Sequence, residues 1–259
     1  MIPTLFQVGP IPIHSFGLMM ILCFLAAWRR LYLSLQAAGK PPELAERLIT
    51  WAAVGGIVGA RLGYIISYPT EFLADPLGML FGSAGFVFLW GFLAGVLACY
   101  VLLRKENQPF LQFADLASPA LAIGYAIGRI GCQLSGDGDY GGPAALPWAI
   151  GYPLGVVPTD PGVRVHPAPV YESLMAIAIA AMLLAPGMQR RLPGPGQLFG
   201  LYLLLTAAAR FLVEEVRIEP IVWQSMTQAQ LLAIFLAGVG ALMMFRRRNY
   251  VPHENVPAA

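Results

Sequence analysis

The chain has 259 residues, of which 58% are hydrophobic and 12% are charged, and its formal net charge is +2. A soluble domain carries about 25% charged residues, whereas the mean hydropathy of this chain is +0.66. The composition therefore predicts an integral membrane protein, and the nearly neutral charge gives no support to a nucleic-acid partner.

The first twelve residues lack the basic region and the small-residue cleavage site of a secretory signal peptide. We therefore expect the first apolar segment to stay in the membrane. The three cysteines, Cys23, Cys99 and Cys132, show no CxxC spacing. Their arrangement predicts neither a metal site nor a disulfide framework, and no cofactor is expected.

About seven apolar segments are long enough to cross the hydrocarbon core, which takes roughly 20 residues per helix. They cover approximately residues 14–35, 46–67, 86–103, 112–133, 168–187, 197–217 and 227–245. Residues 68–85 contain Pro69 and Pro76 and are interpreted as an interfacial stretch between two spans. The predicted fold is an all-α integral membrane protein with one domain over residues 1–259.

Residues 134–167 form the longest polar insertion and are rich in glycine and proline, which predicts an irregular cap with little helix. Orientation follows from the short loops, because cytoplasmic loops carry an excess of Lys and Arg. Seven spans put eleven of the sixteen basic residues on one side: Arg29, Arg30, Lys40, Arg47, Arg104, Lys105, Arg190, Arg191, Arg246, Arg247 and Arg248. That side is predicted to be cytoplasmic with the C-terminus, while the N-terminus and the cap face the periplasm.

Arg129 lies near the end of the fourth apolar segment, between Gly128 and Gly131 and ahead of Asp137 and Asp139. A charge at membrane depth costs about 2.5–3.5 kcal/mol and indicates a functional site. Glycines on either side allow another backbone or a ligand to approach closely. The two aspartates between glycines are alternatively ordinary turn residues.

Other charged and polar residues fall in the same outer half of the predicted bundle. They are His14, Arg61, His166, Tyr171, Glu172, Arg210, Glu214 and Arg217. The last three are spaced i, i+4 and i+7 and are expected to share one helix face. Because a guanidinium fork binds phosphate in a bidentate way, several buried arginines suit an anionic phospholipid headgroup.

Structural interpretations compete with this one. Arg210, Glu214 and Arg217 could form a salt-bridge ladder that only joins helices. Arg61 and Arg217 could extend to the membrane interface from helix ends, and His14 could be an ordinary interfacial histidine.

These motifs, in this order, resemble those of the prolipoprotein diacylglyceryl transferase family. The matching stretches are IHSFGL at 13–18, GARLGY at 59–64, GRIG at 128–131 with YGGP at 140–143, HPAPVYE at 166–172 and RFLVEEVR at 210–217. The resemblance covers about residues 10–220. It implies an enzyme of the bacterial inner membrane whose partners are the bilayer, phosphatidylglycerol and prolipoprotein signal peptides.

The resemblance also implies roles for individual residues. Arg129 and Arg210 would hold the departing phosphate, and the base for the acceptor thiol would be His166, His14 or Asp137. The predicted catalytic residues are thus Arg129, Arg210, His166 and Asp137. The predicted substrate-binding residues are His14, Arg61, Gly128, Gly131, Gly141, Tyr171, Glu172, Glu214 and Arg217.

The chain departs from the family pattern at several positions. It has Trp90-Gly91-Phe92 where the family has His-Gly-Gly, Cys132 and Ser135 where the family has asparagines, and Phe16 where the family has tyrosine. Two alternatives therefore stay open. One is transfer of the same group to another acceptor, and the other is a non-catalytic protein that binds or transports phospholipid.

Overall fold

The computed structural model describes residues 1–82 and 85–245, so Arg246, Arg247 and Arg248 of the predicted cytoplasmic set lie outside the described residues. The long helices are α1 (Ser15–Ala37), α2 (Leu44–Ser67), α5 (Phe88–Lys105), α6 (Phe110–Ser135), α7 (Ala168–Leu183), α9 (Gln197–Glu214) and α10 (Gln228–Phe245). Each coincides with one predicted apolar segment. Five of them, α1, α2, α6, α9 and α10, are long and apolar enough to cross a membrane, and α7 is a shorter apolar helix.

Three short helices lie between the long ones: α3 (Pro69–Ala74), α4 (Pro76–Phe81) and α8 (Met188–Arg191). The first two begin with a proline, whose missing N–H is not needed in the first turn. The carboxylate of Asp75 accepts from the Gly78 N–H at 2.9 Å and caps α4. Leu73 and Phe81 are exposed, in agreement with a stretch that does not pack in a core.

Two β-hairpins lie outside the helices and were not predicted. The first pairs β1 (Thr4–Val8) with β2 (Ile11–His14), and the second pairs β3 (Ile221–Trp223) with β4 (Met226–Thr227). Gln224 and Ser225 at the second turn both have positive φ, at 41° and 66°. Two residues with positive φ are typical of the tight turns that join twisted strands.

The chain divides into two compact units, which are described separately. The second unit covers Leu31–Phe113. In it α2 packs against α5, and Arg47 near the start of α2 is paired with Glu106 just after α5 at 2.7 Å. The Val87 N–H donates to the Ala60 carbonyl at 3.1 Å and holds the beginning of α5 against α2.

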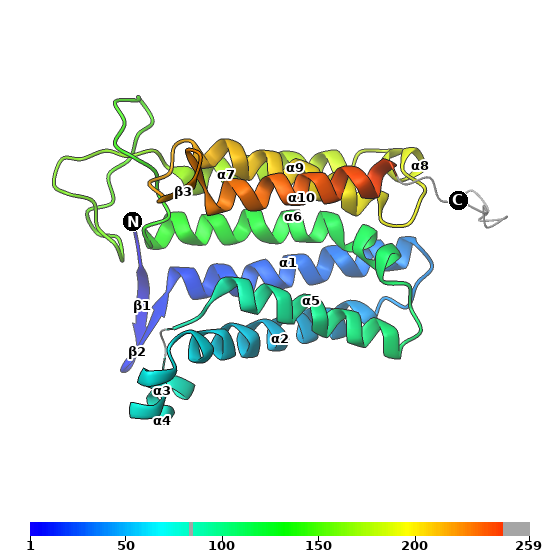
Figure 1. The fold of residues 1–259 in the computed structure, drawn as a ribbon, viewed down its shortest axis with the longest axis horizontal. Helices are drawn as coiled ribbons and strands as arrows, with labels where there is room; N and C mark the ends of the chain where they lie inside the picture. The colour runs from blue at the N-terminus through cyan, green and yellow to red at the C-terminus, as the bar shows by residue number, and fades with distance from the viewer. Residues whose placement is uncertain (83–84, 246–259) are drawn as a thin grey trace. The chain divides into compact units, whose positions relative to one another are not determined.

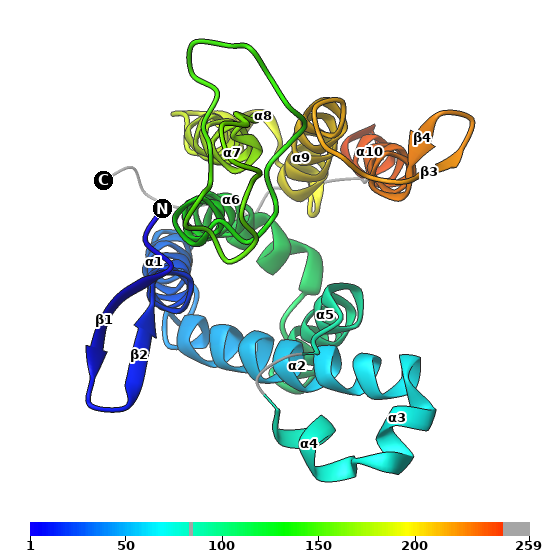
Figure 2. The ribbon, with the colours of Figure 1, turned by 90° about the vertical axis from the view of Figure 1, so that its left-hand side faces the viewer.

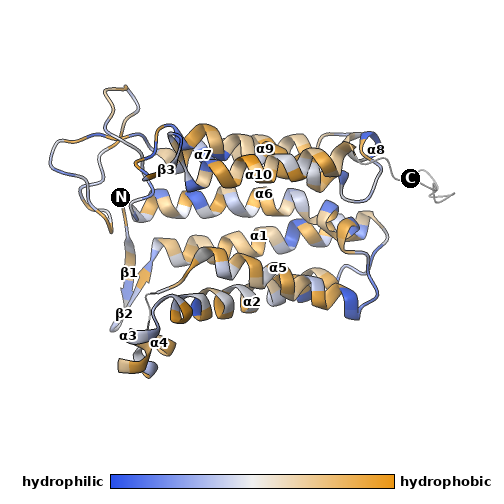
Figure 3. Ribbon diagram, viewed as in Figure 1, coloured by the Kyte–Doolittle hydropathy of each residue, from blue (hydrophilic) through white to orange (hydrophobic). Residues whose placement is uncertain are grey.

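The first unit combines Met1–Arg30 with the chain from Ala114 onward. In it α6, α7, α9 and α10 run alongside one another (Figures 1 and 2). The ribbon of α7 and α10 is coloured hydrophobic over most of its length (Figure 3). The core where α6, α7 and α9 meet is made of Ala122, Ile179, Ala180, Leu183 and Leu198.

Two contacts set the position of α9 in this unit. A Cβ added to Gly200 would lie 2.7 Å from the Gly240 carbonyl oxygen, so the close approach of α9 and α10 requires glycine. At the start of α9, the Asp115 carboxylate of α6 accepts from the Gly196 N–H at 2.6 Å and the Phe199 N–H at 2.8 Å. The first turn of α9 is therefore capped by a side chain of another helix.

Residues 136–167 contain no helix, as the sequence predicts, and lie across the ends of α6 and α7 (Figure 2). The segment is nevertheless anchored. Tyr152 is only 1% exposed, donates its hydroxyl to Gln133 Oε1 at 2.7 Å and stacks on Tyr140 with 4.8 Å between ring centroids. A buried aromatic residue thus holds the irregular segment on the end of α6.

Candidate functional site

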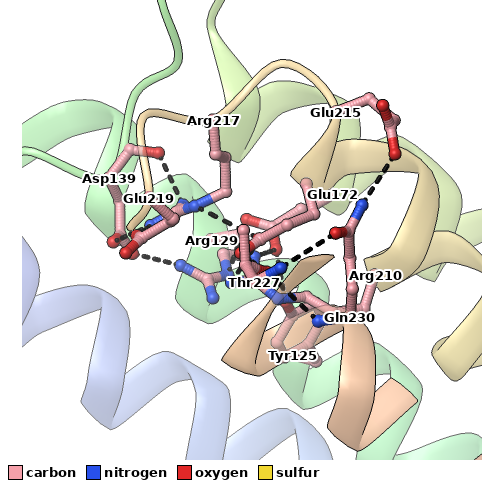
Figure 4. A network of polar contacts seen from close by, with 11 residues as sticks. Tyr125, Arg129, Asp139, Glu172, Arg210, Glu215, Arg217, Glu219, Thr227 and Gln230 are labelled. Carbon is pink, nitrogen blue, oxygen red and sulfur yellow. Dashed lines mark hydrogen bonds and ion pairs between the residues drawn. The ribbon is translucent and has the colours of Figure 1, made fainter. Parts of the chain in front are cut away.

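A cluster of charged side chains forms in the first unit where three helices end or begin. Arg129 comes from the last two turns of α6, Glu172 from the second turn of α7, and Arg210 and Glu214 from the end of α9. Figure 4 shows the side chains of Arg129, Glu172 and Arg210 pointing toward one another. The motifs that the sequence singled out are therefore brought together, although up to 85 residues separate them along the chain.

Glu172 is the centre of this cluster and is 3% exposed. Its Oε1 accepts from Arg210 Nη1 at 3.1 Å and from the Tyr125 hydroxyl at 2.8 Å. Its Oε2 lies 3.1 Å from Arg129 Nε. Arg129 and Arg210 thus meet on one buried carboxylate, and their guanidinium groups lie on the same side of the bundle.

Glu214 has a fully buried side chain and lies between two arginines. Its Oε2 is 2.8 Å from Arg210 Nη2 and 3.8 Å from Arg217 Nε. The expectation that Arg217 continues the same helix is wrong, because α9 ends at Glu214. The chain leaves the helix there, and Gly142 N–H donates to the Val216 carbonyl at 2.8 Å.

Thr227 of β4 and Gln230 of α10 bind the two glutamates at the end of α9, and sequence reasoning missed both. The Thr227 hydroxyl donates to Glu214 Oε1 at 2.6 Å, and Gln230 Nε2 donates to Glu215 Oε1 at 2.7 Å. Thr227 and Gln230 also exchange backbone-to-side-chain bonds of 3.1 and 3.2 Å. This is the capping box Thr-x-x-Gln, a sequence signal just ahead of an apolar run that predicts a helix start.

Asp139, in the loop after α6, lies between two arginines (Figure 4). Its Oδ2 is in short contact with Arg129 Nη1, and its Oδ1 accepts from Arg217 Nη2 at 3.0 Å. Burial raises the pKa of the Asp139 carboxyl, but Arg129 and Arg217 outweigh it and hold the pKa below its usual value. The carboxylate is therefore charged at neutral pH.

Asp137 lies next to this ion pair but contacts different groups. Its Oδ1 accepts from the Asp139 N–H at 3.3 Å. Cys132 Sγ, an Asp137 oxygen and an Asp139 oxygen all lie within 4.8 Å of one another. The spacing would suit a metal ion, but the two arginines already use the Asp139 carboxylate.

His166 and Tyr171 form a second polar group in this unit. The Tyr171 hydroxyl accepts from Trp148 Nε1 at 2.8 Å and lies 3.4 Å from His166 Nδ1. The backbone of His166 is paired with Gly141 and Gly142 of the loop after α6. Trp148 is a residue of the site that the sequence analysis did not select.

The three glycines predicted to line the site differ in their surroundings. A Cβ added to Gly141 would lie 2.2 Å from the Val216 carbonyl oxygen, and one added to Gly131 would lie 3.0 Å from Met19 Cβ. A Cβ added to Gly128 would meet nothing within 4 Å. Gly141 is thus required by the packing of two loops, Gly131 by the packing of α6 on α1, and Gly128 by neither.

Two predicted binding residues make their described contacts elsewhere. His14 is exposed at the end of β2, and its Nδ1 lies 3.4 Å from the Thr4 hydroxyl. Arg61 belongs to the second unit and is 8% exposed. Its guanidinium donates to the carbonyls of Leu80 at 3.2 Å and Gly85 at 2.9 Å, and to that of Gly82 in a short contact.

Tyr125 is a further residue that sequence reasoning missed. It precedes Arg129 by one helical turn, its ring lies 5.0 Å from the Arg129 guanidinium carbon, and its hydroxyl binds Glu172. The i, i+4 spacing was the available signal, because residues four apart face the same way on a helix.

Comparison with known proteins gives the same family that the motifs resemble. The family model described as prolipoprotein diacylglyceryl transferase matches residues 3–246. The phosphatidylglycerol–prolipoprotein diacylglyceryl transferase of Nitratidesulfovibrio vulgaris is 31% identical over 95% of this chain and 94% of that protein. Proteins with the same name from Methylococcus capsulatus and Idiomarina loihiensis are each 32% identical, over 92% and 96% of this chain and 92% and 94% of their own lengths.

Proposed function

Because the chain belongs to the prolipoprotein diacylglyceryl transferase family, we propose that it transfers the diacylglyceryl group of phosphatidylglycerol to the cysteine thiol of a lipoprotein signal sequence. In this reaction the thiolate attacks the glycerol carbon that carries the phosphate. A sulfur–carbon bond forms, the carbon–oxygen bond to phosphate breaks, and glycerol phosphate leaves as an anion. The protein must therefore stabilise negative charge that grows on the leaving oxygen.

The observation that carries the proposal is the meeting of Arg129 and Arg210 on the buried Glu172. Guanidinium groups held in place by carboxylates need no reorganisation when charge develops, and this preorganisation is a main source of catalysis. Glu172 and Glu214 act as positioning residues that fix the guanidinium groups of the two arginines. Arg217 extends the cationic surface through its contact with Asp139.

The acceptor thiol also needs a base, because a free cysteine titrates near pH 8.5. We keep His166, Asp137 and His14 as candidates. His166 is supported by its Tyr171 and Trp148 neighbours, which order the ring. Asp137 is supported by its place beside Asp139, within reach of the arginine cluster.

The remaining predicted binding residues have two kinds of role in the proposal. Tyr171 orders the candidate base, and the close packing of Gly131 and Gly141 shapes the walls around the cluster. Gly128 leaves open space for an acyl chain, and His14 would contact the headgroup or the signal peptide. Arg61 would instead have the structural role that its contacts with backbone carbonyls support.

We also propose seven membrane crossings, with the N-terminus and residues 134–167 in the periplasm and the C-terminus in the cytoplasm. The five long apolar helices support the membrane assignment, and the remaining two crossings would be α5 and α7. The orientation rests on the distribution of Lys and Arg. A reporter that is active only in the periplasm, fused after Ala259, should stay inactive, and strong activity would contradict the orientation.

The transfer itself is tested with purified protein in detergent micelles that contain labelled phosphatidylglycerol and a synthetic prolipoprotein signal peptide. Label should appear on the peptide only when its cysteine is present. A peptide with serine in place of that cysteine is the control. Folded protein that binds phosphatidylglycerol without labelling the peptide would exclude the reaction.

One observation favours a second acceptor. Trp90, at the position where the family carries histidine, is 45% exposed, and its side chain covers Gly63. A large apolar ring there cannot act as an acid or a base. The same assay with other membrane thiols, amines and alcohols would detect transfer to a different acceptor if the signal peptide stays unlabelled.

A further inference from the structure

Each arginine of the cluster is already paired with carboxylates. Three cations face four anions: Arg129, Arg210 and Arg217 against Asp139, Glu172, Glu214 and Glu219. A phosphodiester that entered this cluster would add one negative charge to a set in which negative charges already outnumber positive ones. Because an uncompensated charge away from water is costly, one carboxylate has to leave when the phosphate arrives.

Asp139 is the carboxylate whose departure would release two arginines together. Its side chain is 34% exposed, whereas those of Glu172 and Glu214 are 3% and 0% exposed. Glu219 is 37% exposed, but its ion pair is with Arg217, so its departure would not release Arg129. The two glutamates are carried by α7 and α9, but Asp139 lies in a loop. Gly136 and Gly138 of that loop have φ of 60° and 95°, values that side-chain-bearing residues rarely adopt.

The place of the Asp139 carboxylate has the geometry of a phosphate site. Two guanidinium groups from different parts of the chain, Arg129 and Arg217, each donate to one of its oxygens. The Arg217 side chain is 8% exposed. Its buried Nε has no hydrogen-bond partner among the described residues, although it lies 3.8 Å from Glu214 Oε2. Arginine forks that converge in this way bind phosphate oxygens in pairs.

We infer that the phosphate of phosphatidylglycerol binds between Arg129 and Arg217, in the place that the Asp139 carboxylate occupies here, and that Asp139 withdraws as the lipid binds. One monoanion then replaces another, so the net charge of the cluster does not change. The inference rests on the proposed function and adds Arg217 to the groups that contact the phosphate. After transfer, glycerol phosphate carries more charge than a diester, and the returning Asp139 competes with it and favours its release.

The test is steady-state kinetics on Asp139→Asn, with phosphatidylglycerol in micelles as the varied substrate and glycerol 1-phosphate as product inhibitor. The variant should lower both the KM for phosphatidylglycerol and the Ki of glycerol 1-phosphate. The expected change is about two- to fivefold. The Asp139 carboxylate competes with the phosphate through partly exposed ion pairs, and such pairs are weak. Asp160→Asn, in an exposed part of the same irregular segment, should change neither constant. A KM that rises or stays at the wild-type value would overturn the inference, and a purely structural role would lower the melting temperature without lowering Ki.

A second measurement uses the unaltered protein. It tests the displacement even if the Asp139→Asn variant does not fold or the protein shows no transfer. Amide hydrogen exchange of residues 136–141 is compared in nanodiscs of phosphatidylglycerol and of phosphatidylcholine. Faster exchange in phosphatidylglycerol is expected, because Asp139 leaves its arginines. Equal or slower exchange would contradict the displacement. Absence of transfer with faster exchange would refute the proposed function alone.

Discussion

Arg61 in the second unit and Arg129 in the first are both mostly removed from solvent, but they are satisfied by different groups. Arg61 donates to three backbone carbonyls, one at the end of α4 and two just after it, and lies 4.7 Å from the Phe86 ring centre. Arg129 instead contacts the carboxylates of Glu172 and Asp139. Carbonyls fixed by the chain cannot exchange with a ligand, whereas a partly exposed carboxylate on a loop can. The partner, more than the burial, separates a structural arginine from a ligand-binding one.

The largest expected effect comes from breaking the centre of the arginine cluster. Glu172→Gln keeps the size of the side chain but removes the charge between Arg129 and Arg210. Breaking a buried ion pair by removing one partner costs about 3–5 kcal/mol. We expect a loss of this size in the free energy of unfolding in detergent, together with a fall in turnover. Glu219→Gln, which removes an exposed partner of Arg217, should cost about 1 kcal/mol or less.

Arg210→Ala should lower diacylglyceryl transfer per folded molecule by about 10²–10³, or about 2.7–4 kcal/mol, as when one preorganised charge contact is lost. Arg210→Lys should recover only part of this, because lysine keeps the charge but lacks the planar fork. The exposed Arg190→Ala serves as the control. Wild-type turnover by a well-folded Arg210→Ala protein would remove Arg210 from the catalytic site.

Arg61→Met tests the other side of the comparison. It leaves the carbonyls of Leu80, Gly82 and Gly85 without this donor, which should lower the free energy of unfolding by about 1–3 kcal/mol. Transfer per folded molecule should fall far less than in Arg210→Ala. A melting curve and the transfer assay on the same preparation separate the two quantities. An activity loss as large as that of Arg210→Ala, with no change in stability, would place Arg61 in the binding site.

Thr227→Val is expected to have the smallest effect. It removes the capping hydroxyl of α10 and the donor to Glu214, which should cost about 0.5–2 kcal/mol of stability. Because Glu214 holds Arg210, kcat should also fall by a few fold while KM stays constant. Thr206→Val, which removes a hydroxyl bonded only within its own helix, is the matched control and should leave kcat unchanged.

The helices could be predicted from the sequence because their positions depend on composition, which is local information. All seven predicted segments contain a helix, with ends that differ by a few residues. The course of the chain after Glu214 could not be predicted, because α9 stops where Gly141 and Gly142 pair with Val216 and Arg217. That contact joins segments more than 70 residues apart, and the helical spacing of Arg210, Glu214 and Arg217 carried no sign of it.

The arginines and glutamates of the cluster could be chosen by their motifs, but their partners could not. The sequence analysis chose Asp137 as the catalytic acid of the glycine-rich loop, and only the folded loop brings Asp139 to both arginines. Tyr125 and Thr227 were missed because a lone tyrosine or threonine in an apolar segment is common. Their roles depend on the carboxylates that other helices present to them.

The Asp115 contact described for the fold has a mechanical consequence for the site. Asp115 and Arg129 lie 14 residues apart on α6, about 21 Å along the helix axis. Asp115 accepts hydrogen bonds from the first turn of α9. Arg129 is linked to the last turn of α9 by Glu172, which also binds Arg210. The two helices are thus fastened at both ends, and α9 cannot slide or swivel against α6 without detaching one end.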